Sequence, residues 1–122
     1  MLIATLVLAG AVGALARYLV DGWVQGRARG VYPYGTFVVN ASGSFLLGLV
    51  TGLALYHNLG VIPKTAVGTG FCGAYTTFST FSYETMRLVE EGSLQAAATN
   101  ALTSVVVGLL AAGAGLALTA LL

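Results

Sequence analysis

Hydrophobic residues fill four long blocks of the chain, and short polar stretches separate them. The blocks cover approximately residues 2–24, 35–56, 65–89 and 94–122. A helix needs about 20 predominantly apolar residues to cross the hydrocarbon layer of a bilayer. The pattern therefore predicts an all-α integral membrane protein, in which residues 1–122 form a single domain of four transmembrane helices.

The connections between the blocks are short, which makes consecutive spans antiparallel neighbours. No charged residue precedes Arg17, so the first block lacks the basic start of a cleaved signal peptide. We therefore expect the first span to be retained.

Composition narrows the classes of function. Hydrophobic residues make up 57% of the chain and charged residues only 7%, and a water-soluble domain of this size could not hide so much apolar surface. The five Lys and Arg residues form no basic face for nucleic acid. Cys72 and His57 are the only residues of their types, so no cluster is present for metal or acid–base catalysis and we expect no enzyme.

The basic residues give only a weak rule for orientation. Arg27 and Arg29 fall on one side of the membrane and Lys64 on the other, and counting Arg87 with the first side still leaves a small excess. A strong excess on one side normally fixes topology. We hypothesise that the chain inserts both ways round. Two copies could then pair about an axis lying in the membrane plane, as inverted repeats do.

Small residues recur at close-packing spacing in three of the spans. The sets are Ser44, Gly48 and Gly52; Gly10 with Ala14 and Ala9 with Gly13; and Gly108 with Ala112. Ordinary contacts within a four-helix bundle account for each face equally well. The number of such faces in so small a bundle nevertheless favours self-association, and we expect at least a dimer.

The third span is the least lipid-like, because glycines and hydroxyl residues interrupt it. Gly68, Gly70 and Gly73 permit the helix to break near the midplane, which is tolerated where the freed backbone groups are buried or hydrated. Carbonyl oxygens at Gly73 and Thr76 would suit a hard cation such as sodium. The alternative is a continuous helix that uses its glycines only for packing.

Beyond this point the helical repeat sorts the side chains into two stripes. Thr77, Thr80 and Glu84 form a hydroxyl track, and Phe78 and Phe81 lie in the adjacent stripe. Hydroxyls and the positive edges of aromatic rings can both replace part of the hydration shell of an anion. The phenylalanines could instead face lipid or core.

Other polar residues could extend this path. Asn40 in the second span could donate its amide to an anion while its oxygen is satisfied elsewhere, and the fourth span adds Ser104. Arg17 either snorkels to the interface or turns inward to form an anion-attracting vestibule. Glu84 and Arg87, three residues apart, could pair.

Two long motifs resemble the signatures of a known family. Residues 70–82, GFCGAYTTFSTFS, followed by Glu84, resemble the third-span signature of the bacterial fluoride channels (Fluc, also called CrcB). Residues 35–37, Asn40, residues 43–45 and Gly48 look like the second-span signature of that family. Many members of the family have a second glycine where this chain has Ala74.

The resemblance implies an antiparallel, dual-topology homodimer in a bacterial inner (plasma) membrane, exporting fluoride passively and lowering its toxicity. It also implies a structural sodium ion at the dimer centre. By motif position, the sodium ligands would be the carbonyls of Gly73 and Thr76. The fluoride path would include Asn40, Phe78, Phe81, Thr77, Thr80, Glu84 and Ser104.

The main rival is a small dual-topology drug or cation exchanger. Proton-coupled exchange usually requires an intramembrane carboxylate. Before Glu84 the first three spans contain only Asp21, at an interface. This scarcity argues against the exchanger.

Overall fold

The computed structural model describes residues 1–122 as helices and short connections, without strands. Three long helices are α1 (Leu2–Arg27), α2 (Tyr34–Tyr56) and α6 (Leu94–Leu121), and each is long and apolar enough to cross a membrane. The third span is assembled from α3 (Val61–Lys64), the π-helix η1 (Thr65–Cys72), α4 (Gly73–Tyr75) and α5 (Phe78–Glu90).

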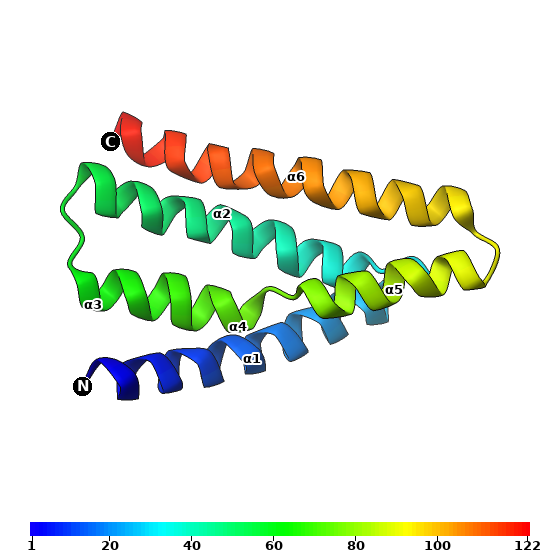
Figure 1. Ribbon diagram of the computed structural model, residues 1–122, viewed down its shortest axis with the longest axis horizontal. Coiled ribbons are helices and arrows are strands. Elements are labelled where there is room, and N and C mark those ends of the chain that lie inside the picture. Colours follow the sequence, from blue (N-terminus) through cyan, green and yellow to red (C-terminus); the bar gives the residue numbers. More distant parts are fainter.

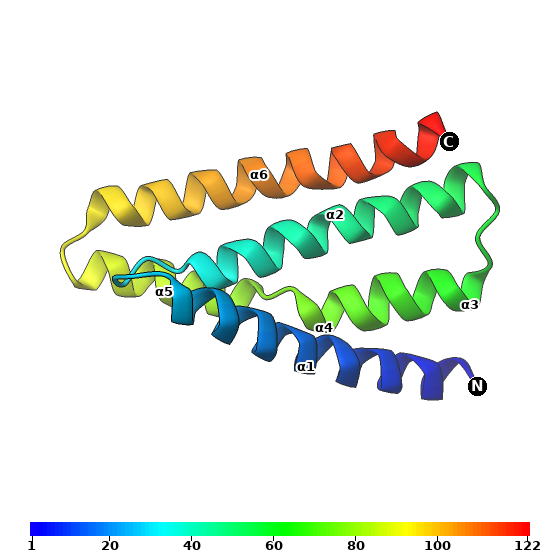
Figure 2. The same cartoon turned by 180° about the vertical axis from the view of Figure 1, so that it is seen from behind.

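Helix α2 is the centre of the bundle. Consecutive spans run antiparallel, so that α2 and α6 lie side by side in the same direction (Figures 1 and 2). The first half of the third span packs on α1, whereas α5 packs on α6. The third span therefore changes neighbours partway along its length, close to the gap between α4 and α5.

Small residues let the backbones of neighbouring helices touch. A β-carbon at Gly48 of α2 would lie 3.0 Å from the Cα of Ala112, and one at Gly115 of α6 would lie 2.8 Å from the amide nitrogen of Leu49. In α1, a β-carbon at Gly13 would lie 3.1 Å from the Cα of Phe71. These faces are occupied by contacts within the chain, so they do not bear on self-association.

A glycine ends α5 and turns the chain into α6. Gly92 has φ +83°, its N–H donates to Val89 O at 3.0 Å, and the N–H of Ser93 donates to Leu88 O at 2.9 Å. This pair of bonds is a Schellman motif, in which the left-handed residue is normally glycine. The turn places the start of α6 beside the end of α5 (Figure 1).

The outer surface is largely apolar, and most of the charged residues lie near the ends of the bundle. Only 18 of 122 residues are buried, and large side chains such as Leu109 and Leu110 project outward from the long helices. Arg27 and Arg87 occupy the last turns of α1 and α5, at one end of the bundle, whereas Lys64 ends α3 at the other (Figure 1). A lipid-facing belt between two polar ends follows from this distribution.

Candidate functional site

The third span leaves helical conformation at two residues. Thr76 (φ −78°, ψ 159°) and Thr77 (φ −147°, ψ 122°) are extended between α4 and α5. The N–H of Thr80 donates to Thr77 Oγ1 at 3.1 Å, so Thr77 is the N-cap of α5. A capped helix thus begins inside the span.

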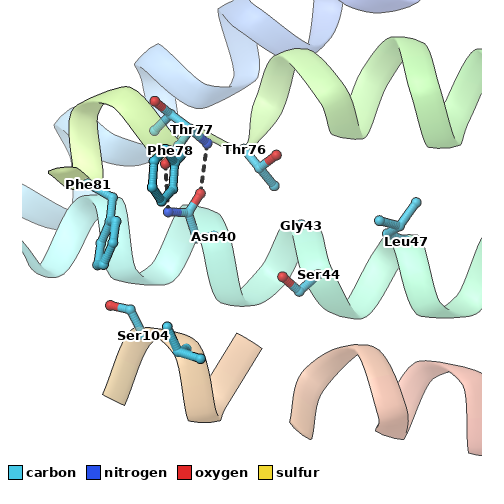
Figure 3. A pocket seen from close by; sticks show the side chains of 10 residues that line it. Asn40, Gly43, Ser44, Leu47, Thr76, Thr77, Phe78, Phe81 and Ser104 are labelled. Atoms are coloured by element: carbon cyan, nitrogen blue, oxygen red, sulfur yellow. Dashed lines mark hydrogen bonds between the residues drawn. The ribbon is translucent and has the colours of Figure 1, made fainter. Parts of the chain in front are cut away.

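Asn40 of α2 holds this extended segment by both ends of its amide. The N–H of Thr77 donates to Asn40 Oδ1 at 2.8 Å, and Asn40 Nδ2 donates to the Thr77 carbonyl at 2.9 Å (Figure 3). An amide group has two N–H bonds. The second N–H of Asn40 has no partner within the chain and is available to another acceptor.

The same arrangement frees carbonyl oxygens at Gly73 and Thr76. In a continuous helix they would accept from the amides of Thr77 and Thr80, but those amides donate to Asn40 and to the Thr77 hydroxyl instead. No other donor within the chain reaches either carbonyl. Free carbonyl oxygens are the donor type that hard cations prefer, and Gly73 lies on the exposed surface of the chain.

A cavity of about 290 Å³ opens beside this segment, with walls from α2, the third span and α6. Phe78 and Phe81 contribute rings whose centroids are 5.9 Å apart and whose planes are tilted by 42°. Figure 3 shows both rings near Asn40, with Ser104 supplied from α6. The full lining is Asn40, Gly43, Ser44, Leu47, Thr76, Thr77, Phe78, Phe81, Ser104 and Val105.

A second cavity, of about 200 Å³, shares Thr77 with the first. Its lining includes the hydroxyl residues Thr36, Thr77 and Thr80, together with Arg17 and Asp21. The hydroxyl of Thr77 donates to Thr80 Oγ1 at 3.1 Å. Hydrogen-bonding groups therefore continue from one cavity to the next through a single residue.

Glu84 accepts a hydrogen bond from the hydroxyl of Thr36 and lines a third cavity, of about 210 Å³. Glu84 does not pair with Arg87, although their spacing in the sequence would allow it. Arg87 Nε instead bonds Glu91 Oε1 at 3.2 Å on the exposed side of α5, because Glu84 turns toward α2 while Glu91 stays within reach one turn further on.

The structure thus divides the predicted site residues among three places. Asn40, Phe78, Phe81 and Ser104 line the first cavity, whereas Gly73 lines none of these three cavities. Thr76 also lines the first cavity, and Thr77 lines both the first and the second. Arg17 and Thr80 line the second cavity, and Glu84 lines the third.

Sequence reasoning overlooked Thr36 as a partner. Thr36 lies one helical turn before Asn40 on α2, and that spacing places it on the same face. Its hydroxyl makes the only side-chain hydrogen bond between α2 and α5. The spacing from Asn40 was the signal that could have found it.

Comparisons with known proteins agree with the two motifs. A family model described as "CrcB-like protein, Camphor Resistance (CrcB)" matches residues 4–116. A protein of Geotalea daltonii named "Fluoride-specific ion channel FluC" is 50% identical over 110 residues, 88% of each chain. One of Streptomyces avermitilis named "Fluoride-specific ion channel FluC 1" is 52% identical over 111 residues, 90% of each chain. Because the match runs through nearly the whole sequence, the chain belongs to the CrcB-like protein family.

Proposed function

We propose that this protein is a fluoride-selective ion channel that lets fluoride leave the bacterial cytoplasm passively and so lowers its toxicity. The observation that carries the proposal is the identity of 50% and 52%, over about nine-tenths of the chain, to proteins named as fluoride-specific ion channels. These relatives also support the prediction that the chain is not an enzyme.

The first cavity supplies groups suited to a small anion. The second N–H of Asn40 is free, and the ring edges of Phe78 and Phe81 carry the positive end of the aromatic quadrupole. The Ser104 hydroxyl donates to Asn100 Oδ1 over a long 3.4 Å, so it can turn to an anion at small cost. Dense donors in a narrow path favour the small ion over larger ones.

The second and third cavities continue the path toward one end of the bundle. Arg17 borders the second cavity and would raise the local concentration of anions there. Thr77 and Thr80 offer hydroxyls along the way, and Glu84 lies beyond them, bonded to Thr36. We place the fluoride route along this series, with Arg17 at its vestibule.

The proposal includes an antiparallel, dual-topology homodimer in the bacterial inner membrane, with the interruption of the third span near the midplane. Phe78 is 79% exposed although it borders the first cavity, and Gly73 is exposed beside free carbonyls. Lipid would leave such carbonyls without partners. A second copy related by a two-fold axis would double the number of Gly73 and Thr76 carbonyls available to a structural sodium ion. The bound ion would bridge the two copies.

Liposome efflux tests the function. Purified protein in liposomes should release fluoride, measured with a fluoride electrode, much faster than chloride, and Phe78→Ile or Phe81→Ile should reduce fluoride release to the level of protein-free liposomes. Thr51→Val is the matched control, because this exposed hydroxyl donates only to Leu47 O of its own helix.

Two results would contradict the proposal. Folded wild-type protein that released neither ion would exclude a channel formed by this chain alone. Release that required a counter-transported cation would instead support the drug or cation exchanger.

A further inference from the structure

Asn100 of α6 makes the only side-chain hydrogen bond between α5 and α6. Its side chain is 2% exposed, and its Nδ2 donates to Thr85 Oγ1 of α5 at 2.9 Å. A buried amide in an apolar bundle is costly unless its groups are paired. The contact with Thr85 supplies that pairing, and it joins two helices that form opposite parts of the first cavity.

Thr85 passes this contact on to Phe81. A hydroxyl has one proton to donate and lone pairs to accept with. Thr85 Oγ1 donates its proton to the carbonyl of Phe81 at 2.7 Å, so its oxygen is free to accept from Asn100. The turn of α5 that carries the Phe81 ring is therefore tied to Asn100 through one hydroxyl.

The other end of the Asn100 amide faces Ser104 of its own helix. Ser104 Oγ lies 3.4 Å from Asn100 Oδ1, one turn further along α6. Phe81 and Ser104 both line the first cavity, whereas Asn100 does not. The buried Asn100 side chain thus contacts Ser104 directly and Phe81 through Thr85, but it does not line the cavity itself.

We propose that Asn100 is a positioning residue that sets the spacing between Phe81 and Ser104, and thereby the discrimination between fluoride and chloride. The inference rests on the proposed function. A smaller anion needs its donors and ring edges close on every side, so a looser wall favours the larger competitor. Loss of the Asn100–Thr85 bond should therefore change selectivity as well as rate.

Substitutions on both sides of the bond test the inference in liposomes. Asn100→Leu and Thr85→Val keep the side-chain shape and remove the bond. Each should lower the fluoride-to-chloride efflux ratio by about fivefold to tenfold, the size expected for one lost hydrogen bond in a buried site. The double variant should lower it no further, and Thr85→Ser should restore it.

Thr103→Val is the matched control for Thr85→Val. The Thr103 hydroxyl is exposed and donates to Thr99 O of its own helix, so the same substitution removes no contact between helices. Its ratio should equal that of the wild type. The inference is wrong if Asn100→Leu lowers the ratio while Thr85→Val does not, because Asn100 would then act on the ion directly. If both ions left more slowly at an unchanged ratio, Asn100 would only help the helices to pack. That result would also overturn the inference.

Hydrogen exchange separates this inference from the proposed function. In detergent micelles, Asn100→Leu should speed deuterium uptake in the turn from Phe81 to Thr85, and Thr103→Val should not. If the wild type passes no fluoride, the proposed function is wrong. Deuterium uptake would still test whether the Asn100–Thr85 bond holds this turn of α5. Unchanged uptake in Asn100→Leu would overturn the positioning role whatever the efflux.

Discussion

At the scale of single residues, Asn40 shows how one amide can serve the backbone and remain available. From the sequence we expect its oxygen to be satisfied elsewhere and its nitrogen to face an anion. The oxygen accepts from the Thr77 N–H, and one of the two hydrogens on the nitrogen is used by the Thr77 carbonyl. Contact between the remaining hydrogen and an anion stays a prediction.

Gly48 gives the sharpest prediction for stability. Gly48→Ala should destabilise the protein by about 1–3 kcal/mol, because the new methyl group would overlap the backbone of Ala112 and force α2 and α6 apart. The free energy of unfolding, measured by titration with sodium dodecyl sulfate in mixed micelles, checks this.

Gly113→Ala on α6 is the control, since nothing lies within 4 Å of the added carbon. It should be neutral or slightly stabilising, because alanine is the better helix former by up to about 1 kcal/mol. Equal losses of unfolding free energy in Gly48→Ala and Gly113→Ala would show that the backbone contact at Gly48 does not determine stability.

Residue types and spacings predicted which side chains could do chemistry, but not their partners. Thr36 with Glu84, and Asn100 with Thr85, each join two different helices. Such pairs depend on how each helix is rotated about its axis. That rotation is set by close packing between backbones, as at Gly48, and the hydrophobic pattern does not determine it.

At the scale of elements, the three glycines of the third span lie within its helical segments. Gly70 lies within η1, where a β-carbon would come 2.9 Å from the Ala9 side chain, so it serves packing against α1. The extended residues are Thr76 and Thr77, after the last of the three glycines. Sequence indicated which span was irregular. It could not place the irregular residues, because Asn40 on another helix holds them.

The cap of α5 is testable by itself. Thr77→Ala should cost about 1 kcal/mol of unfolding free energy, since the Thr80 N–H loses its acceptor at the start of the helix. Amide exchange of Thr80, followed by NMR, should accelerate. Thr77→Ser keeps the hydroxyl and should behave as the wild type.

Thr51→Ala is the comparison for that substitution, because its hydroxyl bonds only its own helix. It should leave the exchange of the Thr80 amide unchanged. If Thr77→Ala also left that exchange unchanged, the helix would begin without help from its cap.

At the scale of the whole molecule, the charge distribution bears on how the chain sits in the membrane. Arg27 and Arg87 mark one end of the bundle and Lys64 the other. The positive-inside preference grows with the difference in Lys and Arg between the two sides. The difference here amounts to a few residues, so we expect both orientations to be populated.

Single cysteines at the two ends can measure this in intact cells. In a Cys72→Ala background, Gly60→Cys and Gln95→Cys place exposed thiols in the α2–α3 link and the first turn of α6, at opposite ends of the bundle, without changing any charge. With a membrane-impermeant maleimide, each position should reach about half of its labelling in permeabilised cells, because each copy exposes one end outside. Full labelling at one position and none at the other would establish a single orientation. The antiparallel pairing, and with it the shared sodium site, would then have to be abandoned, whereas a fluoride path within each copy would not.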